Sequence, residues 1–291
     1  MRRRKRYFGN EQNDMQAQMV WFATGIAAVC ILMILAVTVC QIGRMKRSLL
    51  ETSAESPESE TIVEEIPVTA MPDHKPKSRK KQERRVYTYL QGPRSWKQRI
   101  DWSGEWAEAY LDGGYFGAFG CGLCCMANIY SSQTPYQCSP LDMYEYAKEK
   151  SAYEGGMAIE WGYMRRTLSS LGFDCEVNKK PDSYRAFKNM VSEARCCIVL
   201  VSSNDSAVYW QNTPGHYVTL FLYDENKETV FLADPGDPEH NRHKIKLRTI
   251  YRSLKTASNW QCLLVGQYHK KQDTWKNKET GGNWMVPDYV K

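Results

Sequence analysis

The pattern of apolar and polar positions predicts one folded domain, which begins near residue 86. Beyond that point, five segments have apolar residues at helical spacing and four runs are rich in β-branched and aromatic residues. The predicted helices cover about 122–131, 140–148, 157–171, 183–193 and 247–255. The predicted strands lie near 196–202, 216–223, 229–234 and 261–267. Helices that precede most of the strands are typical of an α+β fold, and residues 86–291 suffice for a single domain.

Residues 19–41 form an apolar segment without a charged side chain over 23 positions. As a helix with a rise of about 1.5 Å per residue, this segment would span roughly 35 Å, which is enough to cross a bilayer with some tilt. A cleaved signal peptide is the main alternative. The apolar run is long for a signal peptide, however, and no small-x-small cleavage site follows it. We therefore predict one transmembrane helix at 19–41.

The charges around this segment predict its orientation and a flexible connection to the domain. Five basic residues precede the segment and three follow it, so the positive-inside rule places residues 1–18 in the cytoplasm and the domain outside. Residues 42–85 combine a Glu-rich stretch with a Lys/Arg-rich one and contain few large apolar side chains. Such a composition predicts a charged, flexible stalk. Its basic block could also touch anionic cell-surface polymer or lipid.

The net charge of +6 is concentrated outside the predicted domain. Residues 1–85 carry 15 Lys/Arg and 10 Asp/Glu, whereas residues 86–291 carry 24 and 23. A nucleic-acid-binding domain is expected to be strongly basic, and this domain is nearly neutral. We therefore expect no nucleic-acid partner.

A glycine-rich segment, GYFGAFGCGLCCMANIYSS at 114–132, contains a candidate nucleophile. Cys121 lies between two glycines, at or just before the start of a predicted helix. At a helix N-terminus the free N–H groups and the helix dipole lower the pKa of a thiol and favour the thiolate. The flanking glycines would leave room for a substrate carbonyl. Taken alone, Cys121, Cys124 and Cys125 could equally be small residues of a hydrophobic core.

Two of the predicted strands form a hairpin that carries a histidine and an aspartate. Residues 216–234 read HYVTLFLY-DEN-KETVFLAD, which is two apolar runs around a polar turn. If the turn is centred on Glu225, His216 lies directly opposite Asp234, with Cβ atoms about 4.5–5.5 Å apart. A carboxylate that orients an imidazole is what a catalytic thiol requires. A shift of one residue would separate the pair, and a pair that only caps the hairpin is the structural alternative.

The three candidates occur in the order Cys121, His216, Asp234, which is the order of papain-like cysteine hydrolases. The FGCG motif, the PGHYVTLFLYD strand and the ADPGD turn resemble those of the bacteriocin-processing (double-glycine) peptidase superfamily. The resemblance is closest to its stand-alone, membrane-anchored bacterial branch and covers about residues 86–268. It implies a papain-like fold, in which the helix that carries the nucleophile packs on an antiparallel sheet. It also implies Cys121 as the nucleophile, His216 as the base and Asp234 as the orienting carboxylate.

The sequence departs from this family at the group that helps to bind the oxyanion. Family members usually have a glutamine a few residues before the cysteine, but residues 99–120 contain neither Gln nor Asn. Of the two nearest candidates, Gln91 and Gln98, we prefer Gln91. The segment YTYLQGP reads as extended, and a long insertion could return the cysteine to its side. Classical members are fused to a transporter, whereas this sequence has one predicted span and no P-loop, so a role in leader-peptide export does not carry over.

The remaining side chains of the domain offer weaker candidates. The loop DPGDPEHNRH at 234–243 holds acidic residues and two histidines without a Cys-x-x-Cys or HExxH motif, so we expect neither a metal ion nor another cofactor. The eight cysteines of the domain leave an odd number beside Cys121 and do not indicate a disulfide framework. Five tryptophans could line a groove for a peptide or glycan, or belong to the core: Trp96, Trp102, Trp106, Trp161 and Trp210.

These expectations combine into one leading function and one alternative. The leading function is a single-pass, membrane-anchored cysteine hydrolase, most simply a peptidase, which forms a thioester at Cys121 with a peptide or protein substrate outside the cytoplasm. The alternative is a catalytically inactive peptidase-fold module that binds peptide or cell-wall material. The missing nearby glutamine favours this alternative.

Overall fold

The computed structural model describes residues 79–203, 209–285 and 288, all of which belong to one compact unit, Asp73–Lys291. A second unit, Met1–Pro72, lies outside the described residues, and so do the predicted transmembrane helix and most of the predicted stalk. Within the described ranges, we find no helix with the length and apolar character needed to cross a membrane.

Helices and strands alternate along the described part of the chain. Their bounds are α2 (Arg79–Arg84), α3 (Pro93–Lys97), the 3-10 helix η1 (Glu105–Glu108), β1 (Tyr110–Leu111), β2 (Gly114–Tyr115), α4 (Phe116–Phe119), α5 (Cys121–Gln133), α6 (Pro140–Ser151), α7 (Trp161–Ser170), β3 (Phe173–Asn178), α8 (Tyr184–Glu193), β4 (Cys196–Val201), β5 (His216–Asp224), β6 (Thr229–Ala233), β7 (His243–Lys246), α9 (Leu247–Ser253) and β8 (Cys262–Tyr268).

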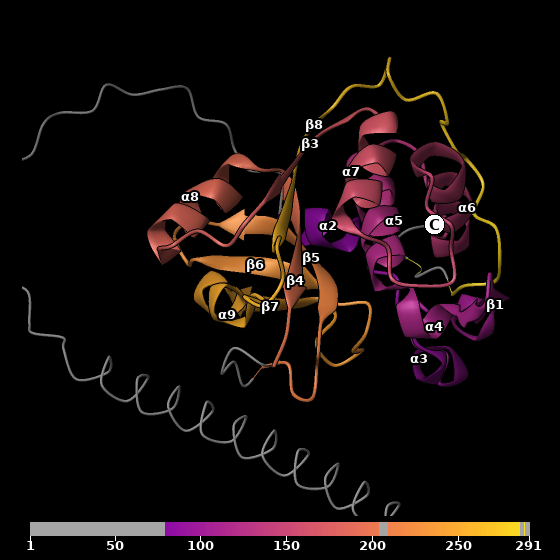
Figure 1. Ribbon diagram of the computed structural model, residues 1–291, viewed down its shortest axis with the longest axis horizontal. Helices are drawn as coiled ribbons and strands as arrows, with labels where there is room; N and C mark the ends of the chain where they lie inside the picture. Colours follow the sequence, from indigo (N-terminus) through magenta and orange to yellow (C-terminus); the bar gives the residue numbers. More distant parts are fainter. Residues whose placement is uncertain (1–78, 204–208, 286–287, 289–291) are drawn as a thin grey trace, which may run out of the picture. The chain divides into compact units, whose positions relative to one another are not determined.

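A six-stranded antiparallel sheet separates two hydrophobic cores, as the α+β expectation requires. Its strand order is β3-β8-β4-β5-β6-β7. Helices α5, α6 and α7 cover one face, and α8 and α9 cover the other (Figure 1). Strand β4 is central and every residue of its sequence CCIVLV is buried. A strand that is buried on both faces has a continuous apolar sequence, and this run is what predicted the strand.

All the predicted helices and strands are present, but two strands of the six-stranded sheet and the short β1–β2 hairpin were not predicted. Strands β3 (FDCEVN) and β7 (HKIK) lie at the two edges of the sheet and are partly exposed, so they lack a continuous apolar pattern. The helix predicted at 157–171 begins only at Trp161. Residues 157–160 are irregular and follow a turn at Gly155 and Gly156, whose φ angles are 91° and 71°.

The β5–β6 hairpin has a register that differs from the predicted one. Thr219 pairs with Ala233, two positions further along the chain than we predicted. The turn between the strands is longer than the predicted one, and β5 has a bulge at Leu222, where φ is 49°. The prediction that His216 lies directly opposite Asp234 in the ladder is therefore wrong.

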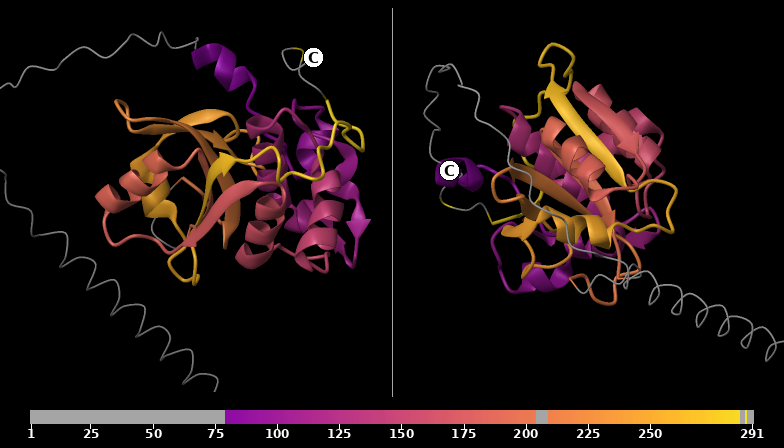
Figure 2. Two further views of the ribbon diagram at one scale, coloured as in Figure 1. Left: turned by 90° about the horizontal axis from the view of Figure 1, so that it is seen from above. Right: turned by 90° about the vertical axis from the view of Figure 1, so that its left-hand side faces the viewer.

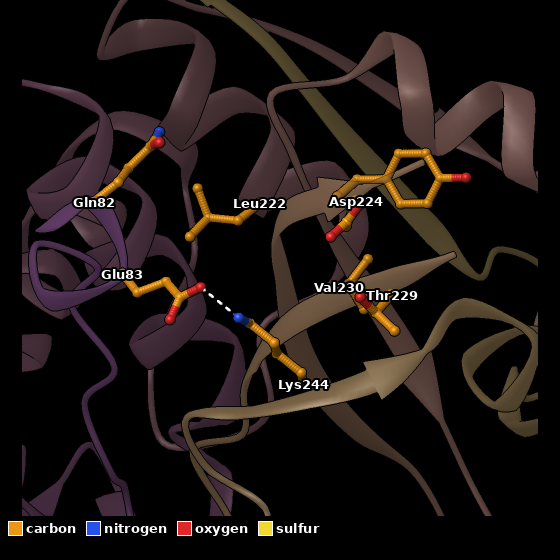
Figure 3. Close-up of a pocket in the computed structure, with 8 residues that line it drawn as sticks. Gln82, Glu83, Leu222, Asp224, Thr229, Val230 and Lys244 are labelled. Carbon is orange, nitrogen blue, oxygen red and sulfur yellow. Dashed lines mark ion pairs between the residues drawn. The ribbon is translucent and has the colours of Figure 1, made fainter. Parts of the chain in front are cut away.

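The last turn of the predicted stalk is helical and is attached to the sheet. Arg242 donates to the carbonyl oxygens of Glu83 and Val86 at 2.9 and 2.7 Å. The Glu83 carboxylate forms an ion pair with Lys244 of β7 at 2.7 Å (Figure 3). This contact borders a cavity of ≈250 Å³ between α2 and the bulged end of the hairpin. The ordered domain therefore begins before residue 86.

Residues 269–285, which we call the C-terminal strap, return to the first residues of the domain (Figure 2). Trp284 forms a bridge with Gly104, and its ring stacks on that of Trp102 at 5.8 Å. The Trp284 ring also contacts the edge of Tyr89 at 4.9 Å. Trp102 and Tyr89 are almost fully buried, so the strap completes the hydrophobic core around the first residues of the folded domain.

Asp273 ties the strap to the helices and the sheet. Its side chain is 1% exposed and accepts hydrogen bonds from the hydroxyls of Tyr130 and Tyr268 at 3.1 and 2.7 Å. It also accepts from the backbone N–H groups of Trp275 and Lys276 at 2.9 and 3.1 Å. A buried carboxylate is stable only with such a set of donors.

We expect Asp273→Ala to lower the free energy of unfolding by about 3 kcal/mol, because four donors would lose their acceptor in a buried position. Asp273→Asn, which keeps one carbonyl acceptor, should lose less. Urea denaturation of the full chain followed by tryptophan fluorescence measures both values. Asp174→Ala is the matched control, because this carboxylate is exposed and forms an ion pair with His269 at 3.0 Å. Equal stability of Asp273→Ala and the unmodified chain would contradict the expectation.

Candidate functional site

Cys121 is the first residue of α5, as the glycine-rich segment predicted. Helix α5 is buried from its first residue to Ser131, so its N-terminus lies inside the domain. The residue before the helix, Gly120, offers no capping side chain. The first N–H groups of α5 and the positive end of its dipole therefore act on the sulfur of Cys121.

The three neighbouring cysteines differ in their electrostatic environment. Burial raises the pKa of the Cys121 thiol, but hydrogen bonding to His216, the charge of His216 and the backbone N–H groups of Tyr217 and Gly122 outweigh it, so its pKa falls below the usual 9.0. Burial raises the pKa of Cys124 and of Cys125 well above that value. Cys121 therefore has the environment of a reactive thiol, whereas its neighbours are core residues.

His216 connects Cys121 with Asp234. It is the first residue of β5, and its Nε2 lies 2.7 Å from Oδ1 of Asp234. The same imidazole interacts with the thiol of Cys121, and Nδ1 is the ring nitrogen that remains for this contact. Although the predicted register is wrong, the predicted pair forms because Asp234 lies past the end of β6, where the chain curls back toward His216.

The carboxylate of Asp234 has no exposed surface and is held by four donors. Oδ1 accepts from His216 Nε2, from the backbone N–H of Gly236 at 3.0 Å and from that of Asp237 at 3.3 Å. Oδ2 accepts from the indole N–H of Trp210 at 2.8 Å. Burial alone would raise the pKa of Asp234, but the charge and hydrogen bond of His216 lower it well below 3.8.

The same contacts keep His216 protonated. Burial lowers the pKa of an imidazole, but the charge and hydrogen bond of Asp234, followed by those of Cys121, raise the pKa of His216 to about 10. A thiol with a lowered pKa beside an imidazole with a raised pKa favours a thiolate–imidazolium ion pair at neutral pH. Such a pair supplies a nucleophile and a proton donor for acyl transfer.

The glycines of the site allow close packing of neighbouring side chains and do not open space for a substrate. A Cβ on Gly122 would lie 2.6 Å from Cγ2 of Ile159, and one on Gly120 would overlap the ring of Phe116. These glycines therefore let other parts of the protein approach α5, in contrast to our expectation that they leave room for a substrate. Gly236 has a similar role on the other side, because its Cβ would lie 2.7 Å from Cε1 of His216.

Gln91 lies between the two segments that carry the candidate residues. Its Nε2 donates to the carbonyl oxygen of Gly117 at 3.1 Å, and its backbone N–H donates to that of Pro235 at 2.8 Å. The long insertion between Gln91 and Cys121 thus returns the chain to the glutamine at Gly117, on the residues that lead into α5. Gln91 is buried, whereas Gln98 ends helix α3 at the surface.

Two residues that support Asp234 were not predicted as part of the site. Trp210 was considered only for a groove or the core, and nothing in its polar sequence surroundings indicates a carboxylate partner. Asn241 accepts from the backbone N–H of Asp234 at 3.1 Å and donates to the carbonyl oxygen of Thr88 at 3.0 Å. Four of the five tryptophans are buried and belong to the core, namely Trp102, Trp106, Trp161 and Trp210.

The histidine-containing loop after Asp234 supports the site through its backbone and through His240. The His240 Nδ1 lies 3.6 Å from Oδ2 of Asp234 and 3.4 Å from Oδ2 of Asp237. Its ring stacks on that of Tyr209 at 4.2 Å. Over the described ranges, no group of three or more His, Cys, Asp or Glu side chains is arranged to hold a metal ion.

We expect Gly236→Ala to slow the alkylation of Cys121 by iodoacetamide at pH 7 by roughly tenfold or more, because the added Cβ displaces the imidazole that stabilises the thiolate. Mass spectrometry of the alkylated peptide measures the rate. Gly162→Ala in helix α7 is the matched control, since a Cβ there has no neighbour within 4 Å. An unchanged rate in Gly236→Ala would show that the ring position is not critical.

Comparisons with models of known protein families and with curated proteins find no match. Among solved structures, the chain is similar to the crystal structure of a protein from Bacillus anthracis that is described as a C39-like peptidase. The two chains are 13% identical with a TM-score of 0.35, and the match covers 52% of this chain and 90% of the other. A similarity at this level carries no argument about activity, so the function has to be argued from the geometry of the site.

Proposed function

We propose that the chain is a cysteine hydrolase with a papain-like site, most simply a peptidase, in which Cys121 is the nucleophile, His216 the base and Asp234 the orienting carboxylate. The observation that carries the proposal is the position of His216, which binds the buried Asp234 through Nε2 and interacts with the thiol at the start of α5. A histidine that only capped the hairpin would not need to lie beside a cysteine at the first residue of a buried helix.

The proposed reaction follows from the protonation states of the site. The proton of the Cys121 thiol resides on His216, and the thiolate attacks the carbonyl carbon of the scissile amide. The imidazolium then gives its proton to the leaving amine, which breaks the C–N bond and leaves a thioester on Cys121. His216 next removes a proton from water, and the resulting hydroxide releases the acid and restores the thiolate. Asp234 keeps its negative charge throughout and holds the ring in place.

We assign the stabilisation of the oxyanion to the backbone N–H of Cys121 and to Gln91. The Gln91 amide uses one Nε2 hydrogen for Gly117, which leaves the second for a substrate oxygen. Its Oε1 is buried without a hydrogen-bond partner among the residues that the structure describes. An oxyanion site requires a donor that is held in place with a hydrogen to spare, which describes Gln91 Nε2.

We also propose that the domain is tethered to a membrane by residues 19–41, with residues 1–18 in the cytoplasm and the domain on the outer side. The length of the uncharged segment and the five basic residues before it support this arrangement. The substrate would then be a peptide or protein encountered outside the cytoplasm.

We expect Cys121 to react with iodoacetamide faster at pH 7 than any other cysteine of the chain, because its lowered pKa provides thiolate at neutral pH. Asp234→Asn removes the charge that raises the pKa of His216. The pKa of Cys121 should then rise, so its alkylation profile should move to higher pH and the rate at pH 7 should fall at least tenfold. In the unmodified chain, hydrolysis should decline as His216 loses its proton near pH 10.

Asp237→Asn is the control for this experiment, because it removes a neighbouring carboxylate that is 42% exposed and does not contact His216. Its alkylation profile should match that of the unmodified chain. If Cys121 reacts no faster than the other cysteines, and Cys121→Ala keeps the biological activity of the chain, the protein is a binding module with a peptidase fold.

We expect Gln91→Ala to lower kcat for peptide hydrolysis by roughly a hundredfold, since an oxyanion donor acts mainly in the transition state. Alkylation of Cys121 by iodoacetamide forms no oxyanion, so its rate should change little. The two rates measured on one preparation therefore separate loss of the donor from damage to the thiol. A parallel fall in both rates would assign Gln91 a structural role instead.

A further inference from the structure

Two loops beside Cys121 form one continuous surface, which we call the lip. The lip consists of residues 110–115, which form the β1–β2 hairpin, and residues 152–160, which connect α6 with α7. Asp112 at the hairpin tip accepts hydrogen bonds from Tyr144 and Lys148 of helix α6. A Cβ on Gly114 would overlap the carbonyl oxygen of Gly156, so the two loops touch and are anchored to the same helix.

The lip borders the nucleophile. A Cβ on Gly122, the residue after Cys121, would lie 2.6 Å from the Ile159 side chain. The ring of Tyr217 lies against Trp161 at 4.9 Å. Burial and then the charges of Cys121, Cys125 and Glu160 raise the pKa of Tyr217. Glu160 is therefore close to the residue whose backbone N–H contacts the thiol.

The lip exposes apolar side chains to an unusual extent. Tyr110, Tyr115 and Met157 are 64%, 59% and 70% exposed, and they are three of the five large hydrophobic residues that are exposed in the described part of the chain. The two tyrosine rings contact each other at 5.0 Å. Tyr115 and Met157 directly follow the glycines at which the two loops meet. Exposed apolar side chains that gather beside a reactive group indicate a binding surface.

The stretch of sequence that contains the lip is acidic. Residues 101–164 contain nine Asp/Glu and only two Lys/Arg, whereas the rest of 86–291 contains 14 and 22. Asp112 is paired with Lys148 at 2.5 Å. Glu154 and Glu160 are exposed and form no ion pair with any residue that the structure describes. These two carboxylates remain available for a cationic ligand.

A buried donor at the inner edge of the lip lacks an acceptor. Trp161 directly follows Glu160, is 8% exposed and has an indole N–H without a hydrogen-bond partner among the described residues. An unsatisfied buried N–H is costly, and a peptide carbonyl would satisfy it. Apolar contacts, two free carboxylates and an unpaired N–H together correspond to the chemistry of a basic, apolar polypeptide.

We propose that the lip is the docking surface for the substrate and selects polypeptides with basic and apolar side chains next to the scissile bond. This inference rests on the proposed peptidase function. The apolar side chains of such a substrate pack on Tyr115 and Met157, and its Lys or Arg side chains approach Glu154 and Glu160. An acidic peptide, including an anionic cell-wall stem peptide, would bring its carboxylates toward those same two residues and be rejected.

The test uses the full chain in a neutral detergent and two fluorescent peptides. Both peptides consist of Leu and Phe residues with three charged positions, which are Lys in one peptide and Glu in the other. We expect kcat/KM for the Lys peptide to exceed that for the Glu peptide by about tenfold at 50 mM salt, and the ratio to fall toward one at 1 M salt. Fluorescence anisotropy with Cys121→Ala measures the same preference as binding, so the result does not depend on cleavage.

The double variant Glu154→Gln/Glu160→Gln should reduce the preference to about twofold or less. The matched control is Glu193→Gln at the end of α8, which should keep the full preference. Tyr115→Ala/Met157→Ala should instead weaken the binding of both peptides to a similar degree. Iodoacetamide should alkylate Cys121 at an unchanged rate in all of these variants, which shows that the site remains intact.

Equal binding of the two peptides, a preference for the Glu peptide, or a preference that survives in the double variant would overturn the role of the lip. The proposed hydrolase function would still stand if Cys121 remained selectively reactive. Failure of Cys121 to react in the unmodified chain would instead refute the hydrolase function, while the anisotropy measurement would still report on the lip.

Discussion

The buried carboxylate of Asp234 is the constraint on which the site depends. A charge with no exposed surface is tolerated only if the protein replaces the water that it has lost. Here an imidazole, an indole and two backbone N–H groups do so. The requirement fixes the loop after β6 and the ring of His216 at the same time. The ion pair at Cys121 is thus a consequence of how the protein accommodates one buried charge.

Burial has opposite outcomes for chemically identical groups within one helix. Cys124 and Cys125 have no exposed surface, and burial keeps them neutral because no cation compensates for the lost water. Cys121 is buried as well, but its position at the first turn places it beside His216 and free N–H groups. A single turn of α5 therefore separates a reactive thiol from inert ones.

Features that depend on residues adjacent in the chain could be predicted from the sequence. The start of α5 follows from glycines before an apolar run, and strand β4 follows from six consecutive apolar residues. The hairpin register could not be predicted, because the bulge at Leu222 leaves no mark in the alternation of side chains. The partnership of Trp210 with Asp234 joins positions 24 residues apart and depends on a loop whose path only the complete fold determines.

The C-terminal strap has a consequence for the order of events during synthesis. Trp284 completes the aromatic cluster around Tyr89 and Trp102, yet the ribosome makes it almost two hundred residues later. The segment that carries Gln91 to the site emerges from the same cluster, so its packing includes a ring from the strap. The packing of the segment that carries Gln91 thus combines residues from both ends of the folded domain.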